Sequence, residues 1–153
     1  MTEEPLMYPF INATKRYQSI FLQKTGELDL ERYHYLLVLI NDYEEKLTQQ
    51  EIADILKIDK SFMVSIVDYL SGKGYVKRQK SSEDKRAFII KLTGAGKDAV
   101  PGIKEAVINV NKRAIEGLSE AQVELFKEVL TKIQMNLAEK APFDLRINIK
   151  KFK

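Results

Sequence analysis

The chain has 153 residues, of which 44% are hydrophobic and 31% are charged, and it contains no cysteine. A chain of this size and composition is expected to fold as one domain with a hydrophobic core of its own. Without cysteine it has neither disulfides nor thiolate metal ligands, and its one histidine, His34, does not suffice for a histidine-built metal site.

The sequence shows no targeting or membrane-spanning segment. Its longest apolar run, near residues 35–40, is far shorter than the roughly 20 residues that span a bilayer. The opening stretch MTEEPLMYPF is acidic and lacks the basic-then-apolar order of a signal peptide. We therefore expect a cytoplasmic protein that does not use a membrane as a partner.

Positive charge is concentrated in one part of the chain. The whole sequence carries a net charge of +3, but residues 60–97 hold nine basic and three acidic side chains, a net charge of +6. A basic segment in an otherwise acidic chain is what a polyanion-binding surface requires. Basic loops also serve solubility, so this asymmetry alone does not decide the function.

Helical spacing of apolar residues predicts the first two elements. Residues 10–24 form one predicted helix, with apolar positions at Phe10, Ala13, Tyr17, Ile20 and Phe21. A second helix is predicted over residues 30–45, with Asp29 as its N-cap. It is apolar on most of its circumference, so we expect it to be the most buried helix.

The next two predicted helices form a helix-turn-helix. Thr48 and Glu51 have the spacing of a capping box at the start of QQEIADILKI. Asp59 then caps KSFMVSIVDYLSGKG, whose end is marked by Gly72 and Gly74. Two helices joined by a turn of three to four residues, the second with a polar outer face, are typical of this motif.

A hairpin and two long helices complete the prediction. The segments YVKRQK and AFIIKL read as strands, with Phe88, Ile90 and Leu92 alternating onto one face, so the unit is a winged helix. Thr93 starts a helix that Pro101-Gly102 is expected to bend or loosen. A second capping box at residues 119–122 starts the last helix, which Pro142 ends before a basic tail. The predicted fold class is mainly α with a small β-hairpin wing.

Residues 47–96 carry a string of motifs that resembles the MarR family of bacterial transcription regulators. The motifs are LTQQEIADIL, then DKS, VDYL and KGYVKR, then EDKRAFIIKLT ending at Gly96. The resemblance implies a single domain over 1–153, with the winged helix-turn-helix at about 30–92, dimerisation helices at about 6–24 and 94–140, and the basic tail at 141–153. It also implies a homodimeric repressor or activator, and we expect a repressor, on a pseudo-palindromic operator in double-stranded DNA.

The resemblance assigns DNA contacts to the helix-turn-helix and to the wing tip. The wing would place Arg86 in a narrow minor groove, supported by Lys85, with Asp84 holding its guanidinium; a solvated surface salt bridge is the alternative. The predicted DNA-binding residues are Thr48, Gln49, Gln50, Lys60, Ser61, Phe62, Ser65, Arg78, Asp84, Lys85 and Arg86.

The recognition helix departs from the family pattern. Members often carry Thr, Thr and Arg where this chain has Phe62, Val64 and Ser65, so a base-reading arginine is missing. Lys60 and Ser61 suit phosphate contacts, and Phe62 would meet a thymine methyl group or pack against the preceding helix. More of the readout is therefore expected from DNA shape.

A small aromatic or phenolic effector is a further expectation from the resemblance. Its site, between the dimer helices and the winged unit, would draw on Tyr17, Phe21, His34, Leu37 and Arg78. The alternatives are that Tyr17 and Phe21 are core residues, that Arg78 contacts phosphate, and that His34 is structural.

Enzymatic activity is not expected. The sequence has no Gly-rich phosphate loop, no metal-ligand cluster and a single histidine, so we predict no catalytic residues, no metal site and no cofactor. The alternative function is a winged-helix protein-interaction module that has lost specific DNA binding, which the missing arginine keeps open.

Overall fold

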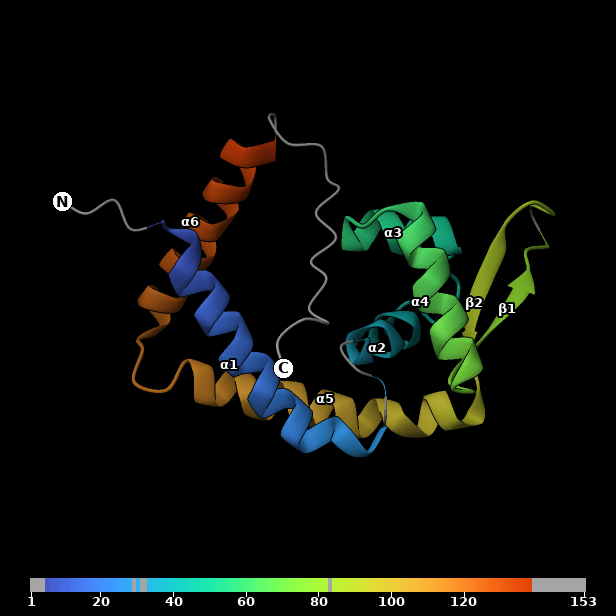
Figure 1. The fold of residues 1–153 in the computed structure, drawn as a ribbon, viewed down its shortest axis with the longest axis horizontal. Helices are drawn as coiled ribbons and strands as arrows, with labels where there is room; N and C mark the ends of the chain where they lie inside the picture. Colours follow the sequence, from blue (N-terminus) through green and yellow to red (C-terminus); the bar gives the residue numbers. More distant parts are fainter. Residues whose placement is uncertain (1–4, 29, 31–32, 83, 139–153) are drawn as a thin grey trace.

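Helices build most of the molecule in the computed structural model, which describes residues 5–28, 30, 33–82 and 84–138. In chain order the elements are α1 (Met7–Thr25), the 3-10 turn η1 (Gly26–Leu28), α2 (His34–Asp42), α3 (Gln49–Leu56), α4 (Lys60–Gly72), β1 (Val76–Lys80), β2 (Phe88–Leu92), α5 (Gly94–Ala114) and α6 (Glu120–Ala138) (Figure 1). The two strands pair antiparallel. This arrangement confirms the predicted fold class. Within the described ranges, no helix has the length and apolar character needed to cross a membrane.

Side-chain caps define where the helix-turn-helix begins and turns. The hydroxyl of Thr48 accepts a hydrogen bond from the N–H of Glu51 (3.2 Å), whose carboxylate accepts one from the N–H of Thr48 (2.7 Å). The carboxylate of Asp59 accepts from the N–H groups two and three residues later. Between the helices, Lys57 has a left-handed backbone with φ of 53°, which redirects the chain. Both predicted caps are confirmed.

Helix α2 is shorter than the predicted helix over residues 30–45. Tyr33 occupies its N-cap position, and the predicted cap, Asp29, lies outside the described residues. At the other end, Glu44 and Glu45 have φ values of 54° and 57°, so the chain leaves the helical path before residue 45. The prediction that this helix is central is confirmed, because Leu37 and Ile40 are almost completely buried.

One hydrophobic core joins the winged unit to the first half of α5. Its buried side chains come from α2, α3, α4, both strands and α5. Each fully buried Leu or Ile in it contributes about 1.5–3 kcal/mol relative to exposure. Ala99, Val100 and Ile103 of α5 belong to this core, so the core of the winged unit extends past the end of β2. α5 is one helix through Pro101 and continues beneath α1 (Figure 1).

The hairpin is attached to the start of α3. The N–H of Ile90 donates to the carbonyl of Leu47 (3.2 Å), and Thr48 forms an isolated antiparallel bridge with Ile89. Ile90 and Leu92 are buried as predicted. Phe88 alternates onto the same face but is 41% exposed, because the hairpin extends past the helices at its tip (Figure 1).

The base of the hairpin meets the start of α5 at a close backbone approach. The hydroxyl of Thr93 accepts from the N–H of Gly96 (3.1 Å), which confirms Thr93 as the cap of α5. The N–H of Thr93 donates to the carbonyl of Tyr75 (3.0 Å). A Cβ atom on Gly96 would lie 2.2 Å from that carbonyl oxygen. The position therefore admits only glycine unless the backbone moves.

We expect the substitution Gly96→Ala to lower the free energy of unfolding by about 1–3 kcal/mol, the usual cost of overpacking a close contact. Urea denaturation measures this change. The matched control is Gly94→Ala in the same helix turn, where an added Cβ meets nothing within 4 Å. Equal stability of the two variants would contradict the proposed role of the contact.

Candidate nucleic-acid interface

The outer face of α4 presents short side chains to solvent. Its exposed residues are Lys60, Ser61, Val64, Ser65 and Asp68. The hydroxyl of Ser65 donates to the carbonyl of Ser61 (3.2 Å), and the hydroxyl of Ser61 donates to the carboxylate of Asp59. Short side chains therefore form most of the outer face of α4, and Lys60 is its positively charged residue.

The structure places Phe62 toward the core and Val64 on the outer face of α4. Phe62 is partly buried and packs against the core, so the structure favours packing over a thymine contact. Val64 is 37% exposed and supplies the apolar group on the outer face, where its methyl groups suit a thymine methyl. Val64 is absent from the predicted contacts. The sequence signal that could have placed Val64 on this face is its spacing of four residues from Lys60 and three from Ser61.

The polar side chains at the start of α3 are partly used within the domain. Thr48 is engaged in the capping box, and its N–H and hydroxyl hold the pKa of Glu51 below its ordinary value. Gln49 is half-buried and accepts a hydrogen bond from Arg78 (3.0 Å). Gln50 is exposed and donates to Asp54 within α3 (3.0 Å). Of the three predicted contacts here, Gln50 is the most accessible.

The hairpin tip carries two exposed basic side chains, Lys85 and Arg86. The N–H of Ala87 donates to the carbonyl of Asp84 (2.9 Å), which closes the turn. The carboxylate of Asp84 accepts from the backbone N–H of Arg86 (2.8 Å). The predicted contact of Asp84 with the Arg86 guanidinium is thus replaced by an Asx-type contact with the main chain, which is the closer donor.

Arg78 is held between the hairpin and both helices of the helix-turn-helix. Its Nε donates to Gln49 (3.0 Å), its Nη1 to Asp68 (2.5 Å) and its Nη2 to the carbonyl of Val64 (3.3 Å). These bonds use three of the five N–H groups of the guanidinium. A phosphate or an effector carboxylate at Arg78 would have to compete with them.

Comparison with known proteins identifies this architecture. Residues 28–87 match the model of the MarR family, over the helix-turn-helix and the wing just described. This part of the chain is similar to the MarR family. The fold of the chain is similar to that of the transcriptional regulator SlyA, with a TM-score of 0.77 and 26% identity, and the match covers 89% of this chain and 96% of that one.

Two further MarR-type structures were solved with DNA and share the fold. The Staphylococcus aureus MepR-DNA complex has a TM-score of 0.80 and 23% identity, and the match covers 90% of this chain and 99% of MepR. A mutant of Escherichia coli MarR complexed with operator DNA has a TM-score of 0.70 and 19% identity, and the match covers 85% of this chain and 99% of MarR.

The residues predicted for a MarR-type effector do not form one site. The rings of Phe21 and His34 meet edge to face, with centroids 5.2 Å apart. His34 is buried, and its Nε2 lies 3.3 Å from the carbonyl oxygen of Thr25 at the end of α1. Leu37 is fully buried in the core. These contacts agree with the alternatives that His34 is a structural residue and that Phe21 is a core residue.

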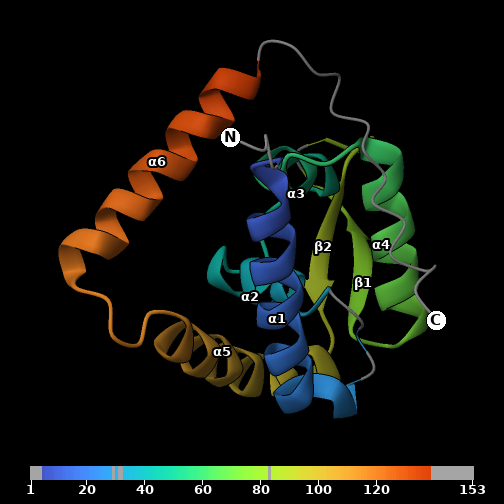
Figure 2. The same ribbon diagram turned by 60° about the vertical axis from the view of Figure 1, so that its left-hand side comes forward.

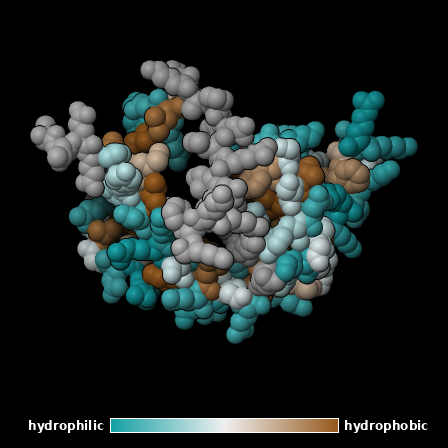
Figure 3. All heavy atoms as spheres, in the orientation of Figure 1, coloured by the Kyte–Doolittle hydropathy of each residue, from teal (hydrophilic) through white to brown (hydrophobic). Residues whose placement is uncertain are grey.

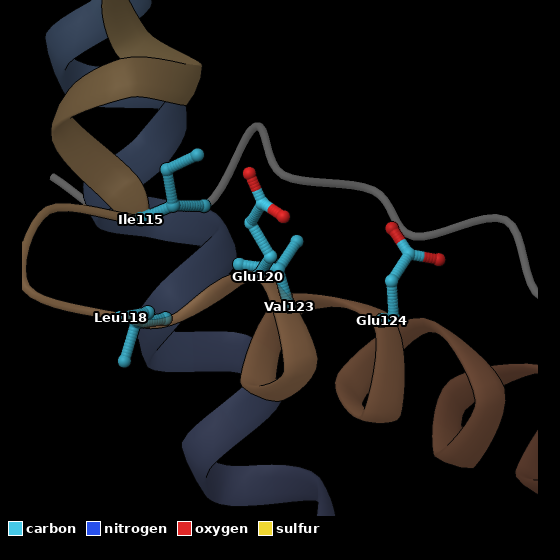
Figure 4. Close-up of a pocket in the computed structure, with 5 residues that line it drawn as sticks. All are labelled: Ile115, Leu118, Glu120, Val123 and Glu124. Carbon is cyan, nitrogen blue, oxygen red and sulfur yellow. The ribbon is translucent and has the colours of Figure 1, made fainter.

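Tyr17 and Arg78 form hydrogen bonds in different parts of the molecule. The hydroxyl of Tyr17 donates to Asn111 of α5 (2.7 Å), and partial burial raises the pKa of Tyr17. Arg78 lies with Gln49 and Asp68 in the winged unit. A shallow cavity of about 250 Å³ at the α5–α6 turn contains none of the predicted effector residues (Figure 4). It is lined by Ile115, Leu118, Glu120, Val123 and Glu124.

Proposed function

We propose that this chain is a homodimeric, sequence-specific regulator of transcription that binds double-stranded DNA. The observation that carries the proposal is the pairing of an exposed recognition helix, α4, with a basic hairpin tip on one rigid winged unit. An α-helix fits the major groove of B-DNA, and an arginine at a hairpin tip fits the negative potential of a narrow minor groove. The fold shared with MepR and MarR, both solved with DNA, supports the same conclusion.

The outer face of α4 supplies contacts that discriminate little between DNA sequences. Lys60 neutralises a phosphate, and Ser61 and Ser65 form hydrogen bonds that tolerate several bases. Val64 contributes apolar contact to a thymine methyl group. Because no arginine or asparagine on this face makes a bidentate base contact, much of the selectivity comes from DNA shape and from the wing.

The wing supplies the strongest electrostatic contact. Arg86 enters the minor groove while Asp84 fixes the turn that carries it, and Lys85 adds a second charge beside the backbone phosphates. Lys80 is exposed on the adjacent strand. Figure 3 shows hydrophilic side chains over this end of the molecule, opposite the apolar surface of α6.

A second copy of the chain covers the apolar surface formed by α1, α6 and the end of α5. No residue from Glu120 to Leu137 is buried in the single chain, and Figure 2 shows α6 turned away from the winged unit. The exposed apolar residues include Leu6, Met7, Tyr8, Ile108, Leu125, Phe126, Val129, Met135 and Leu137. An apolar surface of this extent marks an interface, and a two-fold dimer sets two copies of α4 against a pseudo-palindrome with half-sites roughly 34 Å apart.

Effector control is not part of the proposed function. The five residues predicted for it are used in core packing or in internal hydrogen bonds, and they are divided between the α1–α2 region and the winged unit.

The proposed function is tested by a salt series of binding to the DNA upstream of the protein's own gene, against a shuffled duplex of equal composition. We expect tight binding to the first duplex and a specificity ratio of about a thousandfold or more at physiological salt. Equal, weak and steeply salt-dependent binding to both duplexes would contradict sequence-specific recognition of this region. It would instead favour the protein-interaction module, which a pull-down would then identify.

The substitution Arg86→Ala should weaken binding to the specific duplex by about tenfold or more, because a good contact of this kind contributes about 1–3 kcal/mol. Fluorescence anisotropy measures the affinity, and circular dichroism checks the fold. Lys112→Ala is the matched control, since it removes the same charge from the exposed end of α5. Unchanged affinity of the Arg86 variant would rule out the wing contact.

The substitution Phe126→Asp should convert the dimer into a monomer at micromolar concentration, because it places a charge in the apolar interface. Sedimentation velocity measures the change. Phe126 is 56% exposed in the single chain, so the variant should remain folded. Gln134→Asp is the control on an exposed polar position of the same helix and should stay dimeric. A dimeric Phe126 variant would exclude α6 from the interface.

A further inference from the structure

We propose that Arg78, Asp68 and Gln49 form a lock between the wing and the recognition helix, and that these residues position α4 for DNA binding without contacting the DNA. The inference deepens the proposed function and rests on it. It revises the sequence prediction that Arg78 and Gln49 are themselves DNA contacts.

The lock joins three elements through one side chain. Arg78 lies on β1 opposite Ile90, with its backbone in the sheet. Its guanidinium reaches α3 at Gln49 (3.0 Å) and α4 at both Asp68 (2.5 Å) and the carbonyl of Val64 (3.3 Å). Because guanidinium is planar and keeps its proton at any physiological pH, three contacts in different directions restrict its orientation and that of the elements that it touches.

The contacts of the lock lie outside the hydrophobic core. Ile90 and Val67 hold the inner faces of β2 and α4 in the core, whereas Val64 on the outer face of α4 and Phe88 in the outer part of the hairpin are exposed. Arg78 bridges them at this level, and its own side chain is 27% exposed. It therefore couples the placement of Val64 and Ser65 in one groove to the placement of Arg86 in the next.

Asp68 places a negative charge on the surface that we propose to bind phosphate, and this charge needs an explanation. Its side chain is 58% exposed on the DNA-facing side of α4, where a carboxylate repels the backbone of the duplex. Arg78 lies against it and neutralises it. An exposed ion pair of this kind adds little to overall stability, so we assign its role to the geometry of the binding surface rather than to folding.

The competing interpretation is that Arg78 is a phosphate contact and Asp68 only weakens it. The two interpretations predict opposite signs for Asp68→Ala. If Arg78 binds phosphate, removal of the carboxylate releases the guanidinium, removes a repulsive charge and tightens DNA binding. If Arg78 positions α4, the same substitution loosens the lock and weakens binding although a negative charge has been removed.

The experiment is a double-mutant cycle with Asp68→Ala, Arg78→Ala and the double variant, measured as affinity for the specific duplex across a salt series. We expect Asp68→Ala to weaken binding about fivefold and the double variant to bind like Arg78→Ala alone, as residues that act together are non-additive. We also expect Arg78→Ala to leave the salt slope unchanged, whereas loss of a phosphate contact lowers it by about one.

Controls separate the lock from general charge effects. Asp54→Ala removes an exposed carboxylate from neighbouring α3 without touching Arg78 and should not weaken binding. Lys80→Ala removes a charge from the same strand and serves as the reference for a lowered salt slope. Tighter binding by Asp68→Ala, or a lowered slope in Arg78→Ala, would overturn the proposal.

Hydrogen exchange of the unbound variants distinguishes failure of the lock from failure of the proposed function. We expect amides of β1 and β2 to exchange faster in both Asp68→Ala and Arg78→Ala than in the parent chain or in Asp54→Ala. If the parent chain shows no DNA specificity, the proposed function fails, and the lock is then judged by exchange alone. Unchanged hairpin exchange in both variants would reject the lock whether or not the chain binds DNA.

Discussion

The arrangement of the whole molecule depends on the burial of α5 on two different surfaces. Its first half packs Ala99, Val100 and Ile103 into the core of the winged unit, and its later residues Ala106 and Val110 are also buried. α1 crosses α5 (Figure 1), and Tyr17 of α1 donates a hydrogen bond to Asn111 of α5. One helix is thus a structural part of both the winged unit and the apolar surface. Since protein interiors are close-packed and do not deform smoothly, the orientation of α4 is tied to that surface.

Polar contacts reinforce this junction. Lys104 of α5 donates to Asp42 at the end of α2 (2.5 Å) and holds the pKa of Asp42 below its ordinary value. Lys97 pairs with Glu45 (2.8 Å), which reaches it from a left-handed backbone position. Exposed ion pairs contribute about 0–1 kcal/mol, so the core supplies most of the stability. The pairs connect α5 to the end of α2 and to the turn that follows it.

A rigid junction suits the DNA-binding surface that we propose, in which the individual base contacts are weak. The outer face of α4 has serines and a valine where a base-reading arginine is common in the family, so affinity depends on placing several modest contacts together. The preorganised parts are the capped start of α4, the Asp84 turn at the wing tip and Arg78 between them. Each limits motion before binding, and ordering that is already present in the unbound protein does not have to be supplied when the complex forms.

The sequence by itself determined the features that depend on neighbouring residues in the chain. The caps at Thr48, Asp59 and Thr93, the hairpin and the basic tip follow from local hydrogen bonds and from short apolar periods, and all were predictable. Contacts between distant segments were decided only by the tertiary structure. The three partners of Arg78 lie ten, fourteen and twenty-nine residues away. The exposure of Val64 rather than Phe62 depends on how α4 packs on the core. No local pattern encodes such contacts, because they exist only once the apolar faces have packed and brought remote polar groups within hydrogen-bond distance.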